Sequence, residues 1–147
     1  MIKKNLIIYL VSGAHFDLGW CGTPGACLAR GDEIIRSAID AIMGKYPDYR
    51  FTIEYVYFMR HFLKRYPQYQ KKVLSLLKEG KIEICASITG MMEHVLDGEA
   101  LVQQIIWAKR WAKEILGVNL VSCQLTDCPG HTAQLPQILA KSKVSYL

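Results

Sequence analysis

A chain of 147 residues has the size of one ordinary globular domain, and a hydrophobic fraction of 51% with 21% charged residues excludes an intrinsically disordered protein. The formal net charge is +5, but the densest basic group, at residues 60–72, follows a helical pattern and carries no nucleic-acid-binding motif, so no nucleic-acid partner is expected. No stretch approaches the roughly 20 apolar residues of a membrane-spanning helix, so no membrane partner is expected either.

The five cysteines form an odd set without a C-x-x-C pair, which predicts neither a zinc knuckle nor a complete disulfide framework. Reduced thiols are typical of a cytoplasmic protein, which is the location we expect. The apolar run at residues 6–11 is shorter than the core of a usual signal peptide and is followed at once by a polar motif. It therefore does not predict a signal peptide.

The first unit of the chain is a strand, a loop and a helix. The continuous apolar run at residues 5–11 predicts a strand buried on both faces of a parallel sheet. Glycines and a proline in residues 13–25 predict a loop, and the helical spacing of isoleucines and alanine predicts a helix over residues 32–43.

The same alternation continues to the end of the chain. Further strands are predicted at residues 50–55, 81–86, 118–126 and 144–147, and further helices at residues 56–65, 68–78, 99–116 and 132–141. Strands that alternate with helices predict an α/β fold with a parallel sheet and right-handed crossovers. Because the sequence stops within a predicted strand, we expect residues 1–147 to be the amino-terminal part of a single larger β/α-barrel domain, truncated at its carboxyl end.

Polar motifs follow the first and fourth predicted strands. In an extended segment, alternate side chains point the same way, so His15 and Asp17 can bind one metal ion, or simply hydrogen-bond to each other. Asp127 follows the fourth strand, and parallel strands open at the same edge, so its carboxylate shares a rim with Asp17. Trp20 either packs in the fold or offers a flat apolar face to a sugar ring. Together these residues predict a metal-assisted hydrolase that acts on a polyol such as a sugar.

Other polar side chains near these motifs have two interpretations each. Glu54 either reaches the site or begins a helix, and His131 either orients Asp127 from behind the site or caps the following helix. Cys128 is either a soft metal ligand or an inert thiol, and the odd cysteine set favours the inert thiol. His61 lies within a predicted helix and is interpreted as structural. Four residues of the third rim loop either contact substrate or serve local structure: Glu93, His94, Asp97 and Glu99.

The motifs taken together resemble glycoside hydrolase family 38, the zinc-dependent α-mannosidases. The resemblance covers nearly the whole chain, but only the amino-terminal part of the family's catalytic domain. It lies in six segments in the family's order: residues 15–20 (HFDLGW), 51–54 (FTIE), 80–84 (GKIEI), 99–104 (EALVQQ), 127–132 (DCPGHT) and 134–139 (QLPQIL).

The resemblance implies a seven-stranded β/α barrel of which this chain supplies about the first five strands. It implies one zinc ion bound by His15, Asp17 and Asp127, with Asp127 also acting as the nucleophile of a retaining mechanism and Trp20 stacking on the sugar. The substrate would be an oligosaccharide or another glycoside with an α-mannosidic or similar linkage. A fourth zinc ligand, a histidine, and the general acid/base carboxylate would lie beyond Leu147, so the isolated chain is expected to be nearly inactive.

Two departures from the family pattern leave the sugar open. Pro129 stands where many members have an aromatic residue, and Cys128 adds a thiol beside the nucleophile. Two alternatives to the glycosidase also remain: a metal-dependent carbohydrate deacetylase on a related barrel, and an inactive truncated remnant.

Overall fold

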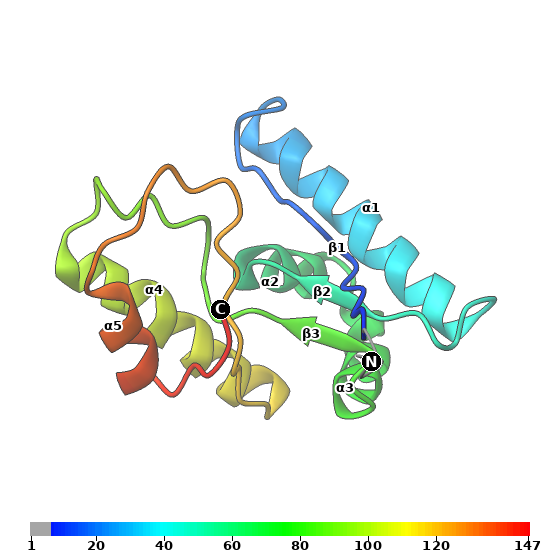
Figure 1. Cartoon of the computed structure of the whole chain (residues 1–147). Coiled ribbons are helices and arrows are strands. Elements are labelled where there is room, and N and C mark those ends of the chain that lie inside the picture. The colour runs from blue at the N-terminus through cyan, green and yellow to red at the C-terminus, as the bar shows by residue number, and fades with distance from the viewer. Residues whose placement is uncertain (1–6) are drawn as a thin grey trace, which may run out of the picture.

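The structure, a computed structural model, describes residues 7–147 as a small parallel sheet with helices around it (Figure 1). Three strands pair in the order of the chain: β1 (Gly13–Ala14), β2 (Phe51–Ile53) and β3 (Ile82–Ile84). Gly13 lies opposite Thr52, and Ile53 lies opposite Ile84. The parallel sheet and the positions of the second and third strands agree with the prediction, although each strand is shorter than expected.

The prediction of a first strand at residues 5–11 is wrong for the part that the structure describes, and residues 5 and 6 lie outside that part. Residues 7–11 form no strand, and the large apolar side chains among them are 69–92% exposed. Pairing begins only at Ser12, whose carbonyl accepts a hydrogen bond of 2.8 Å from the Thr52 N–H. The reason is that β2 starts at Phe51, so residues 7–11 extend past the end of their only neighbour.

The fourth and fifth predicted strands are reduced to a single parallel bridge between Ser122 and Tyr146. The Ala86 N–H donates to the Ser122 carbonyl at 2.7 Å, and the Cys123 N–H donates to the Tyr146 carbonyl at 2.8 Å. These two segments therefore continue the sequential order beyond β3, but too little of each is paired to form a full strand. Of the roughly five strands expected from the first part of a seven-stranded barrel, residues 7–147 hold three strands and this bridge, and the closed barrel stays a prediction.

The first helix, α1 (Pro24–Met43), begins well before residue 32, where the sequence pattern placed it. Thr23 caps the helix by accepting a hydrogen bond from the Ala26 N–H, and Pro24 occupies the first turn, where the missing N–H costs nothing. The other helices lie near their predicted positions: α2 (Val56–Arg65), the 3-10 turn η1 (Pro67–Tyr69), α3 (Gln70–Lys78), α4 (Gly98–Trp111), the π-helical turn η2 (Ala112–Leu116) and α5 (Leu135–Lys141).

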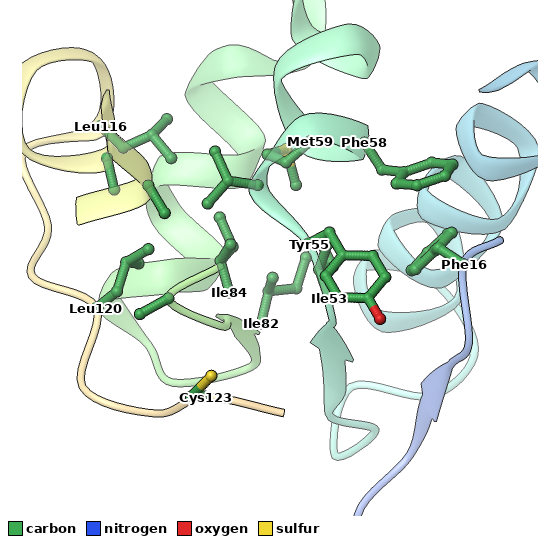
Figure 2. Packing of buried hydrophobic residues seen from close by; sticks show 14 of the residues in the cluster. Phe16, Ile53, Tyr55, Phe58, Met59, Ile82, Ile84, Leu116, Leu120 and Cys123 are labelled. Carbon is green, nitrogen blue, oxygen red and sulfur yellow. The ribbon is translucent and has the colours of Figure 1, made fainter. Parts of the chain in front are cut away.

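The core lies between the sheet and the helices (Figure 2). All three residues of β2 are buried, and Phe58 of α2 packs against Phe16 with 4.6 Å between the ring centroids. A Cβ on Gly31 of α1 would lie 2.4 Å from the Phe58 ring, so this glycine allows α1 and α2 to approach each other closely. Asp32 of α1 is buried and binds two side chains of α2 at 3.0 Å, namely His61 and Arg65. This contact agrees with a structural role for His61.

In the described part of the chain, no helix combines the length and apolar character needed to cross a bilayer. All five cysteines are free thiols.

The burial of the thiols predicts their order of reaction with iodoacetamide. Cys21 is exposed, whereas burial raises the pKa of Cys85 to about 11 and that of Cys123 to about 12. Because the thiolate is the reactive form, we expect Cys21 to be alkylated first at pH 8, and Cys85 and Cys123 only after unfolding. Mass spectrometry of peptides from native and unfolded samples measures this order. Equal rates for Cys21 and Cys85 in the native protein would contradict it.

Candidate active site

A cavity of about 560 Å³ opens at the carboxyl ends of the strands. Its walls come from residues 15–20 after β1, Tyr55 after β2, residues 89–92 after β3 and residues 126–128 after the bridged segment. The structure thus brings His15, Asp17 and Asp127, which lie far apart in the sequence, to one cavity. A larger depression of about 1000 Å³ lies between α1 and residues 45–51, but neither histidine nor cysteine lines it, so its chemistry is poorer despite its volume.

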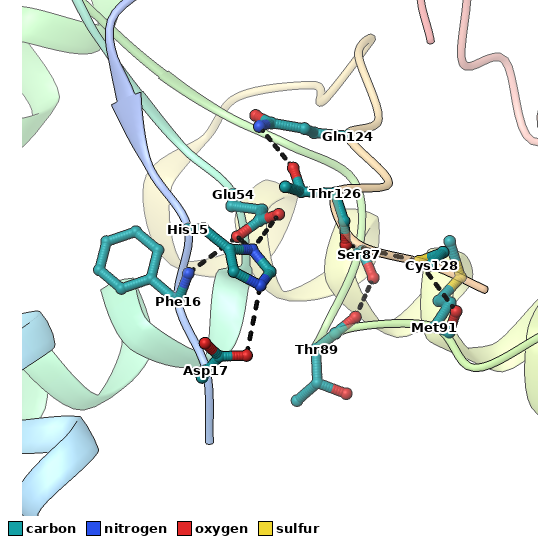
Figure 3. A network of polar contacts seen from close by, with 10 residues as sticks. All are labelled: His15, Phe16, Asp17, Glu54, Ser87, Thr89, Met91, Gln124, Thr126 and Cys128. Carbon is teal, nitrogen blue, oxygen red and sulfur yellow. Dashed lines mark hydrogen bonds and ion pairs between the residues drawn. The ribbon is translucent and has the colours of Figure 1, made fainter. Parts of the chain in front are cut away.

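The imidazole of His15 is held in one orientation by a buried carboxylate (Figure 3). Its Nδ1 lies 3.0 Å and 2.9 Å from the two carboxylate oxygens of Glu54, and the Phe16 N–H donates to Glu54 Oε2 at 2.9 Å. Because an ionised carboxylate only accepts hydrogen bonds, the proton of neutral His15 is on Nδ1, and Nε2 keeps its lone pair. Nε2 lies 3.2 Å from Asp17 Oδ1. This is the arrangement by which proteins orient a metal-binding histidine.

Glu54 is therefore the partner that sequence reasoning left undecided. Its side chain is fully buried, and the side chain of Tyr55, rather than that of Glu54, stands at the cap of α2, where it makes no capping bond. The sequence carries one signal of this role, an acidic residue directly after a short strand whose three residues are all buried. Several residues that line the cavity were not predicted as site residues. Among them are the buried side chains of Tyr55, which is 2% exposed, and Met91, which is 1% exposed.

The electrostatics of His15 balance burial against neighbouring carboxylates. Burial lowers its pKa, but the hydrogen bond and charge of Glu54, with smaller contributions from Asp17 and Asp127, raise the pKa above its usual value overall. In the metal-free chain, this interaction stabilises the folded state when His15 is protonated, and the stabilisation is lost as the pH rises through the raised pKa. The contribution of Asp127 to this shift agrees with its place on the same cavity.

Asp127 lies on a tight turn. Its φ is 54°, in the left-handed region that aspartate tolerates better than most residues, and the Gly130 N–H donates to the Cys128 carbonyl at 2.8 Å. The Cys128 thiol donates to the Met91 carbonyl at 3.3 Å, which ties this turn to the loop after β3. Burial, together with the charges of Glu93 and Glu54, raises the pKa of Cys128, so the thiol is protonated at neutral pH and is a poor metal ligand.

The donor atoms at the cavity fit zinc as a pair but not as a set of three. Two ligands of a tetrahedral zinc ion at 2.0–2.1 Å lie about 3.3 Å apart, close to the 3.2 Å between His15 Nε2 and Asp17 Oδ1. Imidazole nitrogen and carboxylate oxygen are also ordinary zinc donors. Within residues 7–147, however, no three histidine, cysteine, aspartate or glutamate side chains are close enough to hold one ion. Asp127 faces the same cavity as the pair without completing a three-ligand cluster.

Trp20 stands at the cavity with 86% of its surface exposed. Within residues 7–147 the indole is therefore not packed in the core. An exposed aromatic face beside polar groups is the arrangement that suits a sugar ring.

The partner of His131 lies in a different loop from the one that the sequence suggested. His131 Nδ1 lies 2.8 Å from Oε1 of Glu93, which is buried and so does not extend toward a substrate. Two other acidic residues of this region serve α4 itself. Asp97 caps the helix by accepting from the Ala100 N–H, and Glu99 accepts from Gln103.

Comparison with known proteins identifies the family of this chain. Residues 5–147 match the model of the glycosyl hydrolases family 38 N-terminal domain. Alpha-mannosidase 2 of Spodoptera frugiperda is 28% identical over 142 residues, which is 95% of this chain and 13% of that protein. The alpha-mannosidase of Saccharomyces cerevisiae is 23% identical over 93% of this chain and 13% of its own length. The chain thus spans about an eighth of these curated relatives.

Solved structures share the fold. An alpha-mannosidase from Enterococcus faecalis V583 superimposes with a TM-score of 0.80 and 17% identity, over 92% of this chain and 15% of that one. The 4-alpha-glucanotransferase of Thermococcus litoralis superimposes with a TM-score of 0.68 and 19% identity, over 91% of this chain and 21% of that one. The family match over nearly the whole sequence is the decisive observation: the chain belongs to glycosyl hydrolase family 38, and residues 5–147 match the model of its N-terminal domain.

Proposed function

We propose that this chain carries the zinc-binding and nucleophilic half of the active site of an α-mannosidase-like glycoside hydrolase. The observation that supports the proposal most strongly is the His15–Asp17 pair. It is oriented by Glu54 and faces one cavity with Asp127 and Trp20, in a chain of family 38. The substrate class is a glycoside, with an α-mannosidic linkage as the expected bond. The cytoplasmic location remains a prediction from the cysteine content alone.

His15, Asp17 and Asp127 would hold the zinc ion, which requires Asp127 to come closer to the pair than it lies in residues 7–147 of the structure. When bound, zinc would favour the ionised form of the adjacent carboxylate and attract hydroxyl groups of the sugar. Glu54 keeps the proton of His15 on Nδ1, so that Nε2 is free to donate its lone pair. Trp20 would stack on the apolar face of the sugar and orient its anomeric carbon toward Asp127.

Asp127 would act as the nucleophile of a retaining mechanism. Its carboxylate oxygen forms a bond to the anomeric carbon while the glycosidic bond breaks, and the leaving oxygen takes a proton from a general acid. Water then hydrolyses the glycosyl ester, with the same acid residue acting as a base, and the configuration at the anomeric carbon is retained. We expect that acid and a further histidine ligand to come from later strands of the domain.

Both edges of the observed sheet support closure by further strands. On one side, β2 is the one strand that pairs with β1 within residues 7–147, and residues 7–11 expose their apolar side chains. On the other, Tyr146 and Leu147 are 68% and 71% exposed. A seven-stranded barrel would cover both edges, and without such cover these surfaces favour aggregation.

Trapping of the glycosyl-enzyme tests the nucleophile. The intact polypeptide that carries this chain should react with a 2-deoxy-2-fluoro mannosyl fluoride, because the fluorine at C2 slows both formation and hydrolysis of the ester, while the good leaving group restores the rate of formation alone, so that the ester accumulates. Mass spectrometry should find the label on the peptide that contains Asp127. An active enzyme without a labelled peptide would instead support the deacetylase alternative, in which the aspartate never becomes glycosylated. A polypeptide with neither activity nor label would support the inactive remnant.

Zinc content tests the metal site. Asp17→Ala should lower the zinc content of the purified protein severalfold or more, because it removes a carboxylate ligand from the pair with His15. Asp48→Ala is the matched control, since Asp48 is fully exposed and far from the cavity lining. Zinc measured by inductively coupled plasma mass spectrometry should be unchanged in this control. Equal zinc in the wild type and in Asp17→Ala would remove the basis of the metal site.

A further inference from the structure

Glu93 is a buried carboxylate whose two oxygens bind a single segment on another loop. Oε1 lies 2.8 Å from His131 Nδ1, and Oε2 accepts a hydrogen bond of 2.8 Å from the Thr132 N–H. The Glu93 side chain is fully buried, while that of His131 is 53% exposed. A buried charge is costly unless it is hydrogen-bonded, so these two contacts hold residues 131–132 firmly against the loop after β3.

The same arrangement occurs at the predicted metal ligand. Glu54 also binds Nδ1 of a histidine and the N–H of the following residue, namely His15 and Phe16. In that case the oriented histidine lines the cavity. In the segment that contains His131, Cys128 is the last described residue that lines the cavity. The Glu54–His15 and Glu93–His131 pairs therefore share a geometry, but only the first orients a histidine that lines the cavity.

The Glu93 contacts and one further contact attach the segment that directly follows Asp127. The Cys128 thiol donates to the Met91 carbonyl at 3.3 Å, so the segment is attached to the loop after β3 before and after Pro129 and Gly130. Asp127, just before the first attachment, has a φ of 54°, and Gly130, between the two attachments, has a φ of 115°. A backbone in these conformations is maintained only where its surroundings determine it.

We propose that Glu93 is a positioning residue for the nucleophile: through His131 Nδ1 and the Thr132 N–H, it fixes the turn that sets the direction of the Asp127 carboxylate. The proposal rests on the proposed function of Asp127. In this proposal, His131 acts through Nδ1, which binds Glu93. Nε2, which does not bind Glu93, has no role in the reaction.

Isosteric variants separate the two nitrogens of His131. The amide nitrogen of asparagine lies near the position of Nδ1 and can still donate to Glu93, whereas that of glutamine lies near the position of Nε2. We therefore expect H131Q to lower kcat by about 10- to 100-fold, the usual loss for residues that orient an active-site group, while H131N stays near the wild type. E93M should lose at least as much as H131Q, because methionine has a similar length and accepts from neither His131 Nδ1 nor the Thr132 N–H. KM should change little in all three variants.

Kinetics at saturating zinc with an aryl α-mannoside, on the intact polypeptide, measure these values. A normal kcat in E93M, or a loss in H131N as large as that in H131Q, would overturn the proposal. Deuterium uptake by the peptide that covers residues 126–134 gives a readout independent of activity. It should rise in E93M and H131Q but not in H131N, and equal uptake in all three would also overturn the proposal. A wild type without hydrolysis would refute the proposed function alone, and the exchange data would still decide on the positioning.

Discussion

Asp127→Asn is expected to lower kcat for an aryl α-mannoside by about 10⁴-fold or more, a loss typical of removing a catalytic residue that acts in concert with others. Asparagine has nearly the same shape and also tolerates the left-handed backbone at φ 54°, so the turn should persist. It carries no negative charge and cannot form the glycosyl ester. Initial rates at saturating substrate and added zinc measure the loss.

Added azide separates a lost nucleophile from a lost metal. With Asp127→Ala and a substrate that has a good leaving group, azide can attack the anomeric carbon in place of the carboxylate and should give a glycosyl azide of inverted configuration. Asp17→Ala, which keeps the nucleophile, should give no such product. Activity of Asp127→Asn within about tenfold of the wild type would show that another residue attacks the sugar or that none does, since effects of this size are too small for a nucleophile.

Phe58→Ala is expected to lower the free energy of unfolding by about 3–5 kcal/mol, the usual cost of truncating a buried aromatic residue. The ring is 2% exposed, stacks on Phe16 at 4.6 Å and fills the space beside Gly31, where α1 and α2 meet. Because Phe16 directly follows His15, the empty space left by the missing Phe58 ring should also make the segment with His15 and Asp17 more mobile. Urea unfolding, followed by circular dichroism, gives the change from the midpoint and slope.

Tyr46→Ala is the control for this substitution. Tyr46 is 53% exposed, and removing its ring should change the stability by no more than about 0.5 kcal/mol. A loss below about 1 kcal/mol in Phe58→Ala would mean that the contact between α1 and α2 contributes little to the fold.

Hydrophobic periodicity predicted the fold where an element is determined by its own sequence and by near neighbours. The helix expected at residues 56–65 agrees with α2 at both ends. The strands β2 and β3 lie within the ranges predicted for them, residues 50–55 and 81–86. The start of α1 was missed because Gly25 and Gly31 resemble loop residues, although Thr23 followed by Pro24 is a capping signal. The length of each strand depends on its neighbour, which periodicity does not reveal.

The candidate site likewise has residues that the sequence could predict and residues that it could not. Residues on strand ends, such as His15 and Asp127, could be placed on one rim because parallel strands open at the same edge. Glu54 and Glu93 bind histidines 39 and 38 residues away in the sequence, and only the packed structure brings them together. An isolated sequence shows the histidines but not the carboxylates that orient them.

The strictly sequential order of the sheet also has a consequence for synthesis on the ribosome. Each strand pairs with the one made just before it, and Ser122 and Tyr146 extend this order. The sheet can therefore grow from its amino-terminal side while translation continues, without waiting for distant residues. In the proposed barrel, β1 would be the first strand made and the last to receive its second partner. The nascent chain would be most exposed to misassembly at this edge, where chaperone binding would protect it best.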